Sequence, residues 1–331
     1  MLVRITLSLF LFFAAVSTAS MASGAERASD YPSKAVRIIV PTPPGGGLDV
    51  MARVLAQGLQ ERWNQPVVIQ NKPGASMTIG AADVAESKPD GYTILFGMDA
   101  VFVSNTLLHD LRYDAETDLV PVSLLAKGDQ FIVASKDLQA DSLTQLRDLA
   151  KKKSSTINFG SHALGSPTHI AFELMNKHEG VDMLHVLYQG IAPVMNALLA
   201  GEIQLSLVGG SVGGNLISEG RIKALASTGA ERSEMFPDVP TVAEQGFPYM
   251  ASSVWYALAV SKGTPNEIVE KISSTVAEVV KDPDFVEKHV ASKGMVAVGS
   301  TPKELDDLIH AERKSTRDMF QTAGITRESI Q

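Results

Sequence analysis

The chain has 331 residues, 45% hydrophobic and 20% charged, which is enough for two globular domains of ordinary size. Its formal net charge of −8 argues against nucleic acid and anionic membrane surfaces as partners. It contains no cysteine, which excludes disulfides, thiolate metal sites, a cysteine nucleophile and a lipid-anchored terminal cysteine.

The first 25 residues have the pattern of a secretory signal peptide. Arg4 supplies a positive charge, residues 5–16 form an apolar stretch too short to span a membrane, and residues 23–25 are small. Cleavage is expected after Ala25, with Ala22 as the alternative. Because no later segment has about 18 or more consecutive apolar residues, the sequence predicts an exported, periplasmic protein without membrane insertion.

Residues 36–57, VRIIVPTPPGGGLDVMARVLAQ, predict a strand, a turn of proline and glycine, and a helix. Glycines let the backbone approach a ligand closely, and the start of a helix attracts anions through unpaired amides and a partial positive charge. The stretch therefore predicts either an anion site or a tight connection without a ligand.

The same strand–turn–helix pattern recurs in residues 67–87, 91–108, 157–178, 183–201 and 202–220. Further strands are expected in 223–229 and 254–263, and further helices in 135–156, 264–282 and 301–324. This alternation predicts an α/β fold with parallel sheets flanked by helices. Because ligands of open α/β sheets bind at the carboxyl ends of strands, six glycine turns favour two sheets facing each other across a cleft.

These segments resemble the extracytoplasmic solute-binding receptors of tripartite tricarboxylate transporters, often called Bug receptors. The likeness covers about residues 31–324 and is carried by YPSKAVRIIVPTPPGGGLDVMARVLAQ, VVIQNKPGASMTIGAADVAESKPDGYTILFG, NFGSHALGSPTHIA, HVLYQGIAPVMNALLAGEIQL and FPDVPTVAEQGFP. It implies a two-domain clamshell of the periplasmic binding protein type, type II-like, with parallel or mixed sheets flanked by helices.

The resemblance also implies how the chain is divided. Two interdomain crossings are expected, near residues 126–131 and 250–255. Domain 1 would comprise residues 31–128 and 252–331, and domain 2 residues 129–251. Such a receptor, predicted to be a monomer, would capture an organic mono- or dicarboxylate in the cleft, without a cofactor, and deliver it to membrane permease subunits. A ligand sensor for a signalling partner is the alternative.

The resemblance places candidate ligand-binding residues of domain 1 on three turns: Pro44, Gly45, Gly46 and Asp49; Asn71, Gly74 and Ser76; and Val101 and Phe102. Backbone amides of the first turn would bind the carboxylate. Asp49 would cap its helix, order the loop, or meet a ligand ammonium or a bridging water. Val101 and Phe102 stand where relatives have polar residues, which slightly favours an aromatic carboxylate unless Phe102 belongs to the core.

The candidates in domain 2 are Ser161, Gly165, Ser166, His169, Tyr188, Gly190, Gly209, Gly210 and Ser211. His169 would be a structural hydrogen-bonding residue or a ligand contact. Residues 208–211 replace an Asp-Asn pair that relatives carry, and this loss of side chains would enlarge the pocket.

Residues 209–213 also match G-x-S-x-G, the nucleophile elbow of hydrolases, with Ser211 as nucleophile and His289 or His310 downstream. No HGGG-type oxyanion motif precedes it, so a serine hydrolase is the less favoured alternative. The chain lacks the G-x-G-x-x-G, G-K-[ST] and H-E-x-x-H patterns of nucleotide and zinc sites, so no metal is predicted.

Overall fold

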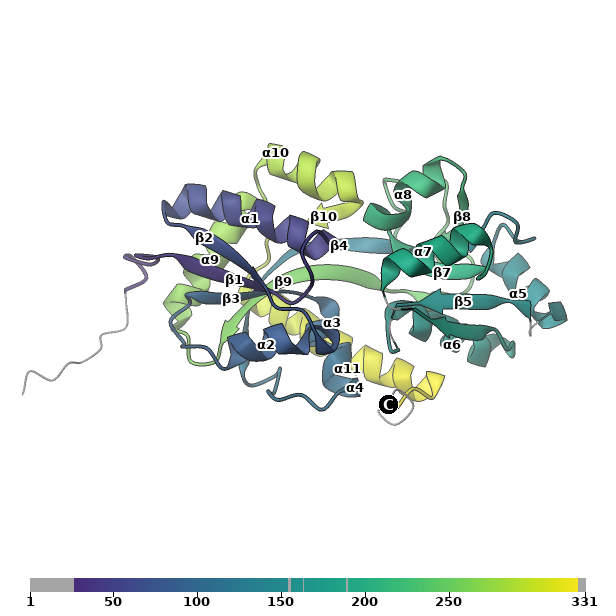
Figure 1. The fold of residues 1–331 in the computed structure, drawn as a ribbon, viewed down its shortest axis with the longest axis horizontal. Helices are drawn as coiled ribbons and strands as arrows, with labels where there is room; N and C mark the ends of the chain where they lie inside the picture. Colours follow the sequence, from purple (N-terminus) through teal and green to yellow (C-terminus); the bar gives the residue numbers. More distant parts are fainter. Residues whose placement is uncertain (1–26, 154–155, 163, 189, 327–331) are drawn as a thin grey trace, which may run out of the picture.

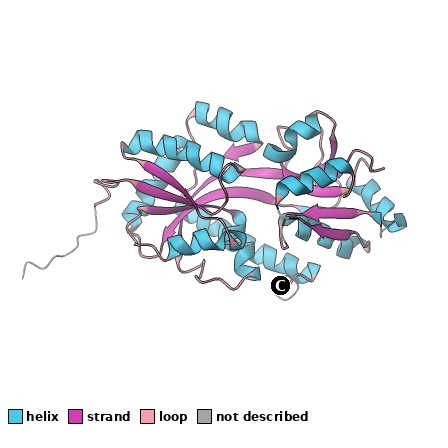
Figure 2. Ribbon diagram, viewed as in Figure 1, coloured by secondary structure: helices cyan, strands magenta, loops and turns pink. Residues whose placement is uncertain are grey.

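The computed structural model describes residues 27–153, 156–162, 164–188 and 190–326. The predicted signal peptide and its cleavage site lie outside these residues. Within them, a mixed sheet of ten strands is covered by helices on both faces, which confirms the predicted α/β class (Figures 1 and 2). None of the helices in these ranges is long and apolar enough to cross a membrane.

The strands are β1 (Val36–Val40), β2 (Val67–Asn71), β3 (Thr93–Met98), β4 (Leu119–Ser135), β5 (Asn158–Ser161), β6 (Leu184–Leu187), β7 (Leu205–Gly209), β8 (Ile222–Ser227), β9 (Ser253–Ser261) and β10 (Met295–Ala297). The α-helices are α1 (Gly47–Trp63), α2 (Thr78–Ala85), α3 (Asp99–Phe102), α4 (Ser104–Leu108), α5 (Leu143–Lys153), α6 (Pro167–Glu179), α7 (Ile191–Ala200), α8 (Gly210–Ser218), α9 (Asn266–Val279), α10 (Pro283–Phe285) and α11 (Pro302–Ala323). Shorter helices are η1 (Ala75–Met77), η3 (Pro248–Met250), η4 (Val286–Val290) and η5 (Ala291–Lys293).

All six predicted strand–turn–helix units are present. The third differs in one respect, because its helix breaks at Val103 (φ −121°, ψ −82°) into α3 and α4. The sequence did not predict the long strand β4 or the short strand β10. β4 is hidden from simple pattern rules because most of it is buried on both faces, so its apolar residues do not alternate with polar ones.

The strand pairings divide the sheet into two lobes that share β4. In the first lobe, β2, β1, β3, β9 and the amino-terminal part of β4 are neighbours in that order, and β10 pairs with β4. In the second lobe, the carboxyl-terminal part of β4 pairs with β7 and β8, and β5 and β6 follow β7. The partner of β4 changes between Asp129, which pairs with β9, and Gln130, which pairs with β7.

Strand directions make the carboxyl ends of the two lobes face each other. β9 is antiparallel to both β3 and β4, so β1, β2 and β3 run in the same direction as β4, toward the second lobe. β7 is antiparallel to β4, and β5 and β6 are parallel to β7, so these three strands run toward the first lobe. The six glycine turns therefore lie at opposed sheet edges, near the centre of the molecule in Figure 1.

Each lobe has apolar cores on both faces of its strands. In the first lobe, α1 and α9 cover one core and α2, α3 and α11 the other; in the second, α5 and α6 cover one and α7 and α8 the other. A fifth cluster joins the lobes, because Leu108 of α4 and Phe320 of α11 pack with Ile170 and Leu174 of α6. Full burial of side chains of this size contributes roughly 1.5–3 kcal/mol each.

Candidate functional site

The first turn is held by the side chain of Asp49. Its carboxylate accepts hydrogen bonds from the Gly45 amide (2.9 Å), from Nε and Nη2 of Arg53 (3.0 Å each) and from Nδ2 of Asn71 (2.8 Å). Burial alone would raise the pKa of Asp49, but these hydrogen bonds and the Arg53 charge lower it to about 2. Gly46 is the N-cap of α1 and no side chain caps it, so Asp49 orders the loop rather than capping the helix.

This network determines which donors of the first turn remain for a ligand. The Gly45 amide donates to Asp49, and Pro44 has no N–H, so neither residue has a free backbone donor for a ligand in this conformation. The amides of Gly46 and Gly47 have no acceptor in the described part of the chain, and both glycines are exposed. Because Arg53 forms an ion pair with Asp49, the negative charge of Asp49 is compensated and repels an anion bound at these amides less.

In the second turn the Asn71 side chain is already hydrogen-bonded, and the backbone after Gly74 is strained. The Asn71 amide group donates to the Thr42 carbonyl (3.0 Å) as well as to Asp49, so it links the first two turns. After Gly74, Ser76 and its two neighbours in η1 have positive φ values of 45°, 52° and 75°. Nδ2 of Asn105 in α4 donates to the Ser76 carbonyl (2.6 Å) and supports this conformation, while Ser76 itself is exposed.

The third turn does not present the apolar surface that the sequence suggested. Val101 and Phe102 are 0% and 1% exposed, and the Phe102 ring stacks on Trp255 at 5.5 Å. Nε of Arg313 in α11 donates to the Phe102 carbonyl (2.7 Å). The break at Val103 turns both side chains into the core, where they cannot contact a ligand in this conformation.

In the second lobe, His169 holds its turn as Asp49 does in the first. The Gly165 amide donates to Nδ1 of His169 (3.0 Å), and the His169 amide donates to Oγ of Ser166, the N-cap of α6 (3.4 Å). The His169 ring stacks on His185 (4.3 Å), whose Nε2 is hydrogen-bonded to Oγ of Ser161 (2.7 Å). Burial, together with the charge of His185, lowers the pKa of His169 to about 4, so its ring is neutral and accepts at Nδ1.

The two remaining turns lie at the starts of α7 and α8. The half-buried Tyr188 ring lies against Gly160, where an added Cβ would be 3.2 Å from the ring. Gly190 is the N-cap of α7 with a φ of 110°, and Gly209 is the N-cap of α8. Gly210 approaches the first lobe, since a Cβ there would lie 3.4 Å from the Cα atom of Gly294.

Among the residues that the structure describes, Ser211 does not lie in a hydrolase arrangement. Ser211 is exposed at the start of α8, and none of its hydrogen bonds within the described residues involves a histidine. The His310 ring is hydrogen-bonded to the Asp306 carbonyl (2.9 Å), and the His289 ring lies against Phe285.

A cavity of about 390 Å³ lies between the lobes, beside the hinge segments of β4 and β9. Of the predicted ligand-binding residues, Gly165 lines it. Three acids that the sequence analysis did not single out also line it: Asp99, Asp129 and Glu312. Burial, and for Asp99 also the charge of Glu312, raises the pKa of each, that of Asp99 to about 7. Lys127 also lines the cavity, so three acids and one lysine would face a ligand there, and this set favours a carboxylate less than the glycine turns do.

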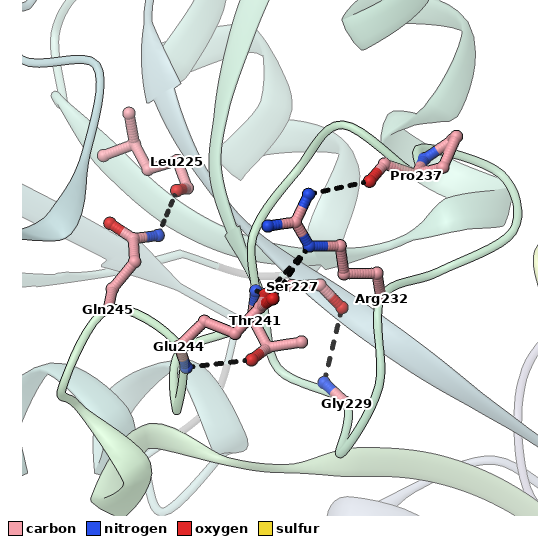
Figure 3. A network of polar contacts seen from close by, with 8 residues as sticks. All are labelled: Leu225, Ser227, Gly229, Arg232, Pro237, Thr241, Glu244 and Gln245. Carbon is pink, nitrogen blue, oxygen red and sulfur yellow. Dashed lines mark hydrogen bonds and ion pairs between the residues drawn. The ribbon is translucent and has the colours of Figure 1, made fainter.

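The motif PDVPTVAEQGFP stabilises the loop that follows β8 (Figure 3). The Thr241 amide donates to Glu244 (2.7 Å), the Glu244 amide donates to Thr241 (3.1 Å), and Nε of Arg232 donates to both Glu244 carboxylate oxygens (3.0 Å each). Nε2 of Gln245 donates to the Leu225 carbonyl of β8 (2.8 Å). These contacts are structural. In the same loop the Gly229 amide donates to Oγ of Ser227 (3.4 Å), and Gly229 lies close to Asp129.

Two lobes linked by a shared strand, with glycine turns at their opposed edges, define the class of periplasmic binding proteins. The structure of the periplasmic binding protein BugD superimposes with a TM-score of 0.78 at 28% identity and covers 89% of this chain and 99% of that protein. Within this class, the chain belongs to the tripartite tricarboxylate transporter receptor family, whose family model matches residues 51–325.

Individual relatives agree with this membership. Protein BugT of Bordetella pertussis is 34% identical over 316 residues, which cover 95% of this chain and 94% of the relative. An R. palustris protein solved with adipate has a TM-score of 0.82 at 32% identity, covering 90% of this chain and 99% of that one. MatC from Rhodopseudomonas palustris, solved with bound malate, has a TM-score of 0.77 at 27% identity, covering 87% and 99%. The family is one of solute-binding receptors rather than enzymes.

Proposed function

We propose that the protein is an exported, monomeric receptor that captures an organic mono- or dicarboxylate between its lobes and delivers it to a tripartite tricarboxylate-type permease. The two domains of the clamshell are residues 31–128 with 252–331, and residues 129–251. The signal peptide, residues 1–25, would direct export to the periplasm.

The observation that carries this proposal is the opposed orientation of the six glycine turns. Exposed, unpaired amides at Gly46 and Gly47 lie at the amino-terminal end of α1, a helix of 17 residues. A hydrogen bond from such an amide to a charged acceptor contributes roughly 1.5–3 kcal/mol. The solved relatives that hold adipate and malate support a carboxylate as the ligand class.

The second turn supports the same position for the ligand. Three consecutive non-glycine residues, 75–77, have left-handed backbones, each of which costs on the order of 1 kcal/mol. Strain of this kind persists where the surrounding structure enforces it, and it concentrates at ligand-binding sites. Ser76, exposed and fixed by Asn105, would add contacts to the ligand beside the first turn.

An aromatic ligand was favoured by the apolar residues Val101 and Phe102 and by the missing Asp-Asn pair at residues 208–211, and the structure removes the first of these two reasons. Val101 and Phe102 are buried, so they do not form an apolar wall. The absence of large polar side chains at residues 208–211 remains, but it opens space at Gly209 alone, because Gly210 packs against Met235 and Gly294. Both aliphatic and aromatic carboxylates therefore belong in a binding test.

The test is a thermal-shift screen of the purified mature protein with malate, succinate, adipate, citrate, benzoate and phthalate. A ligand that binds only the folded state stabilises it by RT ln(1 + [L]/Kd), about 2.7 kcal/mol at a hundredfold excess over Kd. We expect at least one carboxylate to raise the melting temperature, and the corresponding amide or methyl ester to have no effect. If no carboxylate stabilises the protein, the proposed ligand class is wrong.

A further inference from the structure

We propose that the hydroxyl group of Tyr256 is a ligand-binding donor that completes the anion site at the start of α1. The inference rests on the proposed function and adds to it a specificity-determining residue outside the glycine turns. The evidence is the burial of the tyrosine, the lack of a partner for its hydroxyl, and its distance from Gly47.

Tyr256 is held rigidly in β9. It pairs with Met98 of β3 and Ala126 of β4, and its ring packs edge-on against Phe96 with centroids 6.0 Å apart. The residue is 8% exposed. In the described part of the chain its hydroxyl makes no hydrogen bond, and the oxygen itself is not fully buried, so a ligand can reach it. A bound ligand would supply the missing partner.

The hydroxyl lies beside the amino-terminal end of α1. A Cβ atom added to Gly47 would be 3.3 Å from the Tyr256 oxygen, closer than side chains ordinarily approach. Glycine at this position therefore keeps the space between the hydroxyl and the helix end open. The unpaired amides of Gly46 and Gly47 belong to the same end of α1, so a ligand that accepts from the hydroxyl would also face these two N–H donors.

This donor set suits a carboxylate. The partial positive charge at the start of a long helix favours an anion, and Asp49, the nearest acid of the loop, is paired with Arg53. Burial and the charge of Asp99 raise the pKa of Tyr256 to about 12, so the phenol keeps its proton and donates it at neutral pH. One carboxylate of the ligand would accept from the tyrosine and from the amides.

The matched test compares Tyr256→Phe with Tyr113→Phe. Tyr113 is equally buried, at 6% exposure, and its hydroxyl is also unpaired, but it belongs to the core on the opposite face of the sheet. Both variants lose only an oxygen. Calorimetric titration uses the carboxylate that stabilises the wild type most in the thermal-shift screen.

We expect Tyr256→Phe to bind that carboxylate about tenfold to a hundredfold more weakly, and Tyr113→Phe to bind it as the wild type does. Gly47→Ala, which places a methyl group in the same space, should also weaken binding and is a second variant should Tyr256→Phe lose its fold. Wild-type affinity in both site variants overturns the inference while the proposed function stands. A wild type that binds none of the carboxylates overturns the proposed function, and the inference with it.

Discussion

At the residue scale, each lobe fixes the conformation of one glycine turn with a single side chain, and the two lobes use different residue types for this. In each lobe a glycine with positive φ, Gly45 or Gly165, donates its amide to the side chain four residues later, Asp49 or His169. The cost is one backbone donor in each turn. The benefit is that the neighbouring amides are held in one geometry before a ligand arrives, which reduces the ordering cost of binding.

Removing the Asp49 carboxylate should destabilise the first turn. In Asp49→Ala the Gly45 amide, the Asn71 amide group and Arg53 all lose their acceptor. We expect the free energy of unfolding, measured by urea titration, to fall by about 2 kcal/mol, and carboxylate binding to weaken. Asp284→Ala, which breaks an exposed pair with Lys288, is the control and should leave both unchanged. Equal effects of the two variants would contradict a structural role for Asp49.

The hydrogen bond from the Gly165 amide to Nδ1 of His169 predicts that the stability of the protein depends on pH. In the folded protein the pKa of His169 is about 4, below the ordinary value of 6.5, so the unfolded chain takes up the proton first as the pH falls. The contribution is fully present above pH 6.5 and is lost between pH 6.5 and 4, up to about 3 kcal/mol. His185 faces the ring from β6, and Glu173 lies 4.0 Å away on α6; both also titrate.

His169→Asn separates this contribution from that of its neighbours. The Asn side chain offers an acceptor at the position of Nδ1 but has no proton to gain, while His185 and Glu173 remain. We expect the stability advantage of the wild type over the variant to shrink as the pH is lowered from 6.5 to 4, and to stay constant above pH 7. If the difference in unfolding free energy between the two proteins is the same at every pH, protonation of His169 is not the cause of the pH dependence.

At the scale of elements, α11 connects the lobes. It begins with a capping box, in which the Glu304 amide donates to Thr301 (3.3 Å) and the Thr301 amide donates to Glu304 (2.8 Å). Its first turns pack on the first-lobe core through Leu305 and Ile309, and its last turn packs on α6 through Phe320. One helix therefore contacts both lobes, on the face of the sheet that α2, α3 and α6 cover.

Phe320→Ala should weaken this connection. Phe320 is 5% exposed, and truncating a buried phenylalanine typically costs about 3–5 kcal/mol through lost burial and the cavity left behind. We expect a loss near the lower end, because the site borders solvent, measured as the free energy of unfolding in urea. Arg317→Ala, at an exposed position one turn earlier, should change it by less than about 0.5 kcal/mol. If Phe320→Ala lowers the free energy of unfolding no more than Arg317→Ala does, α11 does not connect the lobes.

Sequence patterns predicted the helices, strands and turns better than they predicted which residues contact each other across the fold. The glycine turns are local signals, and the structure confirms the strand–turn–helix units that contain them. Tyr256 lies in a stretch predicted only as a strand, because its neighbour Gly47 is far away in the sequence and comes close through the pairing of β9 with β3. The sequence leaves Phe102 open between a ligand contact and a core position, because nothing local reveals the helix break that turns it onto Trp255.

At the scale of the whole molecule, the hinge consists of few segments. β4 passes from one lobe to the other at Asp129 and Gln130, and the chain returns just before β9. A Cβ added to Gly128 would lie 2.9 Å from Cγ of Met295 and 3.0 Å from the Gly294 carbonyl oxygen, so a side chain at this position would require its neighbours to shift. Because α11 covers one side of the hinge, a change in lobe angle would open the opposite side, where α1 faces α7 and α8 (Figure 1).

Closure of the lobes is the last prediction, and the absence of cysteine makes it measurable. Cysteines introduced at the exposed positions Gln57 of α1 and Glu219 at the end of α8 can be labelled without competition from native thiols. A ligand shifts the closed population only by its difference in affinity for the two states, so energy transfer between the dyes should rise with carboxylate concentration and saturate with the calorimetric Kd. A pair within the first lobe, Gln57 and Lys88, should not respond. If the interlobe pair stays constant while calorimetry shows binding, the receptor captures its ligand without closing, and a permease would have to recognise the ligand rather than the shape of the clamshell.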